Sequence, residues 1–136
     1  MANRLNLTIL TPYGRYFEGE VDFLEVFSDK SSLGILPGHA PLISTLIVSK
    51  MVIKIGDQTY NYAIGGGVIN IEKNKVSLIL NSVEREDEID LSRAQEARKR
   101  AEQRLNESDK NSQIDRDRAK LAYVRALNRI RIATKE

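Results

Sequence analysis

The stretch SSLGILPGHAPLIS, residues 31–44, holds two glycines, two prolines and the single histidine of this 136-residue chain. Its prolines, Pro37 and Pro41, each fix the backbone angle φ and lack an amide donor. Its glycines, Gly34 and Gly38, allow backbone conformations that a side chain would forbid. The stretch therefore predicts an apolar loop of defined geometry rather than a flexible tether.

Glycine and proline divide the chain around this loop. All eight glycines and all three prolines lie between Pro12 and Gly67, and the 69 residues from Val68 onward contain neither. In and just beyond the first part, β-branched and aromatic runs are separated by turn residues. This pattern predicts strands over residues 5–10, 21–27, 46–55, 59–64, 68–71 and 76–80. We therefore expect residues 1–84 to form an all-β sandwich or small barrel.

Three glycine-containing or polar segments should shape this sheet. The pairs Gly56-Asp57 and Lys73-Asn74 predict hairpin turns. The run Gly65-Gly66-Gly67 lacks the following Lys-Ser/Thr of a phosphate-binding loop. It predicts a bulge or a close approach of two backbones within the sheet.

The chain changes composition at Glu84, where Ala, Arg, Glu, Gln and Lys become dominant and favour helix. We expect residues 85–136 to form a two-helix hairpin, with helices over about 91–105 and 114–133 and a loop at 106–112. Asp90 is the expected N-cap of the first helix. The acidic run 84–88 has no histidine partner for a metal and is interpreted as a solvated linker. Both apolar stripes are rich in alanine, so the hairpin should be only marginally stable alone.

Overall composition is that of a small soluble protein, with 41% hydrophobic and 29% charged residues. No apolar run approaches the roughly 20 residues that cross a bilayer, and the first ten residues show no signal-peptide pattern. We expect the chain on the cytoplasmic side, either free or held to a membrane by a partner. The absence of cysteine excludes disulfides, cysteine-ligated zinc and thiol catalysis.

Positive charge is concentrated in the second expected helix. Between residues 118 and 135 there are six basic residues and no acidic one: Arg118, Lys120, Arg125, Arg129, Arg131 and Lys135. The run is either a solvated helix face, favoured near the C-terminus by the helix dipole, or a contact for an acidic protein surface or a phosphate ligand. Nucleic acid is a weaker interpretation, because Tyr123 is the only aromatic residue here to stack on bases.

Spacing also allows a cluster of arginines between the two helices. Arg93 and Arg100 share one helix face, and Arg125 and Arg129 share a face of the other. Four guanidinium groups brought together repel one another unless an anion lies among them, and a nucleoside triphosphate suits bidentate arginine contacts. Asp90 could accept from an adenine amino group, with Ile89 and Ala94 admitting the flat base. The alternative is that these arginines point into water.

The loop LGILPGHAPL, residues 33–42, resembles the signature of the epsilon subunits of F-type ATP synthases, except that Ser31 and Ser32 replace a frequent glycine and a polar or acidic residue. The segment IDLSRA, residues 89–94, is similar to the I/L-D-x-x-R-A motif with which some bacterial members bind ATP. The resemblance extends to the terminal LAYVRALNRI. It implies an ATP site of Glu84, Ile89, Asp90, Arg93, Ala94, Arg100, Arg125 and Arg129.

The resemblance further implies a non-catalytic subunit of a proton-translocating complex, peripheral on the cytoplasmic face of the bacterial cell membrane. The sandwich would attach to the gamma shaft and the membrane c-ring. The hairpin would inhibit hydrolysis when extended toward the alpha and beta subunits, and ATP would stabilise its folded form. We expect partner contacts through His39, Arg118, Lys120 and Arg131, no required cofactor, no metal and no nucleic acid.

Two other classes of function are open on the sequence. A free nucleotide-sensing protein would use the same arginines without a partner. A small enzyme would need a positioned acid or base, and His39 has no serine or cysteine nucleophile in a recognised setting. Gly65-Gly66-Gly67 and the acidic run offer no convincing alternative site.

Overall fold

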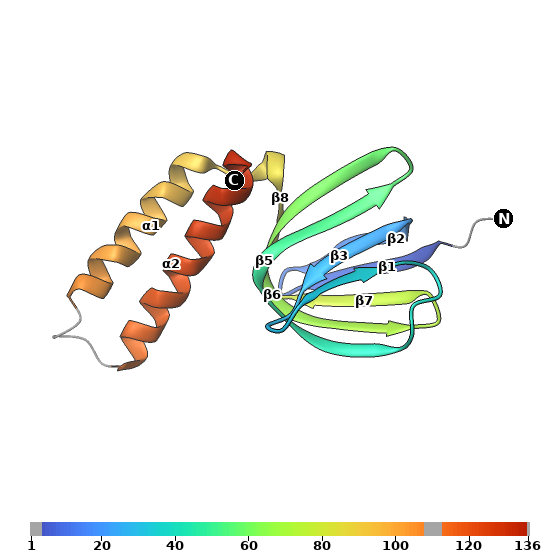
Figure 1. The fold of residues 1–136 in the computed structure, drawn as a ribbon. Helices are drawn as coiled ribbons and strands as arrows, with labels where there is room; N and C mark the ends of the chain where they lie inside the picture. Colours follow the sequence, from blue (N-terminus) through green and yellow to red (C-terminus); the bar gives the residue numbers. More distant parts are fainter. Residues whose placement is uncertain (1–3, 108–112, 136) are drawn as a thin grey trace. The chain divides into compact units, whose positions relative to one another are not determined.

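A computed structural model describes residues 4–107 and 113–135. The chain divides into two compact units, residues 1–86 and 87–136. The first is built of strands and the second of two helices (Figure 1). The predicted fold class is confirmed. The predicted boundary at residues 84 and 85 lies two residues earlier than this division, inside a strand.

The first unit is one hydrogen-bonded sheet that folds over on itself as a sandwich (Figure 1). Its order is β2-β1-β7-β6-β5-β3-β4, with β8 also paired to β6, and only the β1–β7 pair is parallel. The long strands β5 and β6 run through both layers. The strands are β1 Leu5–Thr11, β2 Gly14–Val21, β3 Phe23–Phe27, β4 Ser32–Ile35, β5 Leu42–Ile55, β6 Gln58–Glu72, β7 Lys75–Leu80 and β8 Val83–Arg85.

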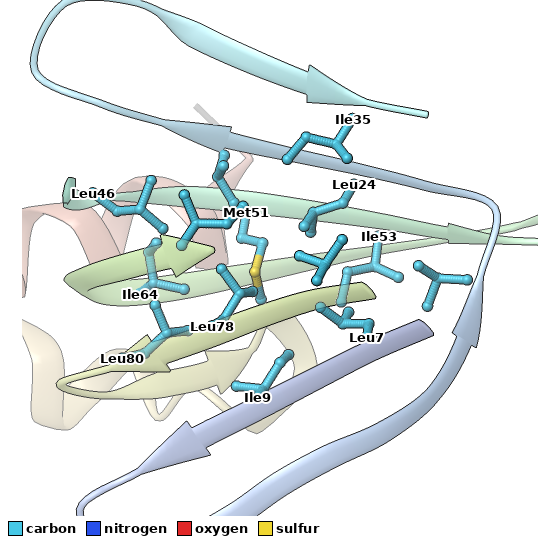
Figure 2. Close-up of a cluster of buried hydrophobic side chains, with 14 of the residues drawn as sticks. Leu7, Ile9, Leu24, Ile35, Leu46, Met51, Ile53, Ile64, Leu78 and Leu80 are labelled. Carbon is cyan, nitrogen blue, oxygen red and sulfur yellow. The ribbon is translucent and has the colours of Figure 1, made fainter. Parts of the chain in front are cut away.

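The core forms because alternate residues of these strands are apolar and point between the layers. Leu5, Leu7 and Ile9 of β1 are at most 1% exposed, and Leu78 of β7 is fully buried. Figure 2 shows Leu7, Ile9 and Leu78 meeting side chains of β3, β5 and β6 around Met51. All residues of the core cluster belong to the first unit. The sandwich therefore has a hydrophobic core of its own.

The glycine triad is a close backbone approach, as one of the two interpretations predicted, and not a bulge. The β5–β6 pairing passes through it without a shift of register. A Cβ at Gly67 would overlap the carbonyl oxygen of Ile79, and one at Gly65 would overlap the Ser82 hydroxyl. Because the neighbouring backbones come so near, β6 continues through the glycines. The prediction of two separate strands at 59–64 and 68–71 is therefore wrong.

The stretch at residues 31–44 is only partly a loop, which corrects the prediction. Its first residues form β4 and its last ones begin β5. The loop proper is residues 36–41, where the Leu36 carbonyl accepts a hydrogen bond from the amide of His39 at 3.1 Å. Gly38 has a φ of 87°, so glycine is needed at this turn. Defined loop geometry is confirmed for this shorter segment.

Strands β2, β4 and β8 are absent from the sequence-based expectation, apart from Val21 at the end of β2. Each of them pairs with a single neighbour. Such edge strands bury little on their outer side, and β2 carries Glu18 and Glu20 next to Gly19. These strands form because they pair with β1, β3 and β6, although their own sequences show little of the apolar alternation that identifies a strand.

Both predicted hairpin turns are confirmed. Lys73 and Asn74 have φ values of 49° and 66°, as a two-residue turn requires, and Gly56 has a φ of 58°. The Gly56-Asp57 turn is also held by Asp22, whose carboxylate accepts from the Gly56 amide at 2.6 Å and from Arg4 Nε at 2.9 Å. These bonds, first from Gly56 and then from Arg4, hold the pKa of Asp22 below its usual value.

Replacing Asp22 by asparagine should make the free energy of unfolding depend less on pH in the acid range. Because the pKa of Asp22 is lower in the folded chain, its contribution is complete above the unfolded-state pKa of about 3.9 and is lost as pH falls through the folded value. Urea unfolding of Asp22→Asn should therefore show a stability deficit at pH 6 that shrinks toward pH 3. The exposed loop residue Asp29, changed to asparagine, is the control. A deficit that is the same at every pH would contradict this role.

The second unit consists of α1, Leu91–Asn106, and α2, Gln113–Thr134, which pack side by side (Figure 1). The predicted N-cap is confirmed, since Asp90 Oδ1 accepts from the amide of Arg93 at 3.1 Å. Among the residues of the hairpin whose burial the structure describes, the buried ones are mainly alanines, as expected: Ala94, Ala101, Ala119 and Ala126, with Ile130 and Ile132. In the predicted loop, Asn106 ends α1 and Glu107 is its C-cap, while 108–112 lie outside the described residues.

The acidic run 84–88 is not the expected solvated linker. Glu84 and Arg85 belong to β8, and Glu86–Glu88 form one turn of 3₁₀ helix. Glu86 accepts a hydrogen bond from the side-chain amide of Asn61 at 3.2 Å. Pairing with β6 therefore extends the sheet through Arg85. Within the described ranges, no helix is long and apolar enough to span a membrane.

Candidate nucleotide-binding and partner-binding residues

The expected nucleotide-binding residues of the first helix lie around its N-terminus, except Arg100, which lies further along the helix. Asp90 uses one carboxylate oxygen for the cap, and Ile89 beside it is half-buried. Arg93 and Arg100 are exposed and stand seven residues apart, about two turns of α1. A helix N-terminus with nearby guanidinium groups offers hydrogen-bond donors to an anion.

Ala94 does not lie on the open surface with these residues. Its side chain is only 1% exposed, because the small residues of α1 and α2 form the buried seam of the hairpin. A base would contact the Ala94 side chain only if this seam opened.

The remaining expected nucleotide-binding residues are divided between α2 and the sheet. Arg125 is exposed and Arg129 is half-buried, one helical turn further along α2. Glu84 is half-buried in β8, within the first unit. The structure thus brings the four arginines onto two packed helices, whereas Glu84 belongs to the other unit.

The expected partner-binding residues of α2 are all accessible. Arg118, Lys120 and Arg131 are exposed. Residues 118–135 contain six basic residues and no acidic one, so positive charge is in excess along most of this helix. Such a surface attracts acidic partners, and the attraction weakens as salt is added.

His39 has a defined ring orientation in the loop at residues 36–41. Its Nδ1 lies 2.7 Å from the carbonyl oxygen of Ala40. A carbonyl can only accept, so Nδ1 carries the proton of this bond. In the neutral ring, Nε2 is then the hydrogen-bond acceptor that remains. A partner group facing it would be a donor.

An apolar row on the outside of the sandwich is a feature that the sequence analysis missed. Leu10 of β1, Ile79 of β7 and Val68 of β6 lie directly opposite one another in the register and are 38%, 58% and 38% exposed. On β5, Thr45 is opposite Val68, and Ile43, two residues before it, is 73% exposed. The signal was present, since Ile79 interrupts the alternation of β7 between buried Leu78 and Leu80. Contiguous exposed apolar residues of this kind mark interaction surfaces.

Metal-binding geometry is not a feature of the described residues, among which no group of three His, Cys, Asp or Glu side chains could hold an ion. The chain's basic surface, apolar row and ordered loop are instead suited to binding other molecules.

Comparison with known proteins finds two successive family domains in the chain. Residues 4–86 match the model of the ATP synthase delta/epsilon chain beta-sandwich domain, and residues 87–134 match that of its long alpha-helix domain. The junction of the two matches coincides with the division of the structure after residue 86.

The curated relatives and the solved structures that resemble this chain are also ATP synthase chains or complexes. The ATP synthase epsilon chain of Pelotomaculum thermopropionicum is 42% identical over 99 residues, 73% of this chain and 74% of that one. That of Bacillus thuringiensis (strain Al Hakam) is 40% identical over 101 residues, 74% and 76% of the two chains. A chain of the Euglena gracilis mitochondrial ATP synthase has the same fold, with a TM-score of 0.76 at 18% identity over 89% of this chain and 76% of that one.

Proposed function

Since this chain belongs to the delta/epsilon chain family of ATP synthases, with epsilon chains among its relatives, we propose that it is a non-catalytic central-stalk subunit of a bacterial F-type complex. The observation that carries the proposal is the match of both family domains, in order, over residues 4–134. The complex would lie at the cytoplasmic face of the cell membrane, and this chain would meet the membrane only through its partners.

The sandwich is the part that attaches to the rotor, made of the gamma shaft and the c-ring. The apolar row of Leu10, Val68 and Ile79 supports this role, because a rigid sheet presents it and water covers it in the isolated chain. At about 25 cal/mol per Å², burial of such a row against a partner would favour assembly. Because the first unit has its own hydrophobic core, this surface should keep its conformation when the helices rearrange.

The hairpin is the regulatory part, able to extend toward the alpha and beta subunits and obstruct hydrolysis. Its alanine seam supports this role, because small side chains bury little area and hold the two helices weakly. A weakly held packing can be shifted by a partner or ligand that binds one arrangement better. Exposed Arg118, Lys120 and Arg131 would bind acidic surfaces of the beta subunits in the extended form.

ATP is the ligand that would stabilise the folded hairpin. Arg93 and Arg100 on α1 and Arg125 and Arg129 on α2 would meet around its phosphates, and Asp90 would accept from the adenine amino group. Glu84 and Ile89 would complete the site, and Ala94, buried between the helices, would keep them close enough for arginines of both to reach the phosphates. A ligand that requires both helices has a differential affinity for their packed form, which is all that such control needs.

We expect the isolated chain to bind ATP with one-to-one stoichiometry in a calorimetric titration. Arg93→Ala and Arg125→Ala should each weaken binding roughly tenfold or more, because a hydrogen bond to a charged group contributes about 1.5–3 kcal/mol. Arg116→Ala is the matched control, since Arg116 is exposed on α2 and lies nine positions before Arg125, on the opposite side of the helix.

Two outcomes of this titration test the ATP site separately from the family assignment. Unchanged affinity in both Arg93→Ala and Arg125→Ala would remove the proposed site. Failure of the unaltered chain to bind ATP would remove ATP control but leave the role in the rotor as it is.

A further inference from the structure

The loop at residues 36–41 is joined to a distant turn by one side-chain hydrogen bond. The amide of Gly38 donates to Oδ1 of Asn74 at 2.7 Å, across 36 positions of sequence. Asn74 also fixes the start of β1, because its main-chain carbonyl accepts from the amide of Asn6 at 2.7 Å. One residue therefore connects three segments at this end of the sandwich.

Asn74 can do this because it occupies a left-handed turn position. Its φ of 66° is one that asparagine tolerates better than most residues. The two-residue turn places the side chain beside the loop while β6 and β7 hold the backbone. The partner of the bond is equally well defined, since Gly38 is held at a φ of 87° within the turn between Leu36 and His39.

The loop that this bond holds exposes apolar surface in an ordered form. Leu36 is 58% exposed, and Ile43, two residues beyond the loop in β5, is 73% exposed. His39 is oriented by its bond to the Ala40 carbonyl. Ordering an exposed leucine adds little to the stability of an isolated sandwich. A binding surface that is already ordered in the free protein loses less conformational entropy on binding, which raises its affinity.

We propose that Asn74 is a positioning residue for partner binding: it holds the loop at residues 36–41 in the conformation that the rotor of gamma and c subunits binds. This inference rests on the proposed function for the identity of the partner. The position of the loop itself rests only on the hydrogen bonds above. Asn74 makes its contribution through Gly38 and need not touch the partner.

Two substitutions separate the hydrogen bond from the turn. Asn74→Gly keeps the left-handed backbone and the carbonyl that binds Asn6, but it removes the Oδ1 acceptor. Asn74→Asp keeps an acceptor oxygen at the same place, in a residue that also tolerates positive φ. Asp should therefore rescue what Gly loses, while both variants retain the turn.

The experiment combines amide hydrogen exchange at Gly38 with affinity for the reconstituted gamma–c-ring rotor. Asn74→Gly should speed exchange at Gly38 and weaken rotor binding about two- to tenfold, as expected for loss of one hydrogen bond. Asn74→Asp should stay close to the unaltered chain in both measurements. Thermal unfolding of all three chains checks that the sandwich is equally folded.

Three results would overturn the proposal. Unchanged exchange at Gly38 in Asn74→Gly would show that the bond does not hold the loop. Faster exchange with full rotor affinity would show that the rotor does not need the ordered loop. No rotor binding by the unaltered chain would contradict the proposed function and the binding half of this inference, while the exchange data would still decide whether Asn74 holds the loop.

Discussion

A chain ending at Glu88 should fold, join the rotor and support proton-coupled ATP synthesis, while ATP hydrolysis by the assembled complex should rise. The sandwich keeps its whole core in this chain, because every residue of the core cluster precedes the cut. If the extended hairpin holds about nine complexes in ten inactive, a preference of about 1.4 kcal/mol, its removal should raise hydrolysis about tenfold. Hydrolysis and coupled synthesis are measured on reconstituted complexes.

A full-length variant with Arg118, Lys120 and Arg131 changed to alanine should show part of the same increase. These side chains are exposed and basic, so their attraction to acidic subunit surfaces should also weaken with salt. The complex with the truncated chain should lack that salt dependence, which makes it the control. A truncated chain that does not assemble, or that assembles with inhibition unchanged, would show that the roles of the two units are misassigned.

Gly67→Ala should be the most destabilising single substitution tested in the sandwich, lowering the free energy of unfolding by about 3 kcal/mol or more, or preventing folding. The added Cβ would overlap the Ile79 carbonyl oxygen and lie 2.9 Å from the Leu80 Cα. Both atoms are backbone, so β6 and β7 would have to separate. Strand β7 supplies Leu78 to the core, and its displacement would disturb both layers.

Gly34→Ala is the matched control in the same sheet. Its Cβ would lie 3.5 Å from the ring of Phe23, which is ordinary contact, and Gly34 has no positive φ. Urea unfolding should place Gly34→Ala close to the parent chain. A Gly67→Ala chain within about 1 kcal/mol of the parent would mean that the strands separate easily at this point, contrary to the tight approach in the structure.

Much of the fold could be predicted from local patterns. The alternation of Leu5, Leu7 and Ile9 identifies a half-buried strand, and Asp90 before a helix-forming segment identifies a cap. What local patterns could not supply was pairing. Strand β2 owes its place to β1 rather than to its own apolar residues, and β6 continues through three glycines because two neighbouring backbones accompany it.

For the candidate site too, local spacing was predictable from the sequence, whereas contacts between distant elements were not. Helical spacing predicts that Arg93 and Arg100 share one face of α1, because 3.6 residues per turn is a local rule, and both residues are exposed in the structure. Spacing also placed Ala94 in the alanine stripe that is buried between the helices. It did not show that Glu84 belongs to a strand, since that depends on which element pairs with which. The bond between Gly38 and Asn74 was equally invisible, because a turn and a loop 36 residues apart meet only in the folded sheet.

Purification of the native chain from its source membranes tests the central claim most directly. If the chain is a central-stalk subunit, an affinity tag on it should recover alpha, beta, gamma and c subunits together, in ratios that stay constant through further chromatography. Subunit composition can be read by mass spectrometry of the purified material. A chain that purifies alone under the same mild conditions would contradict the account.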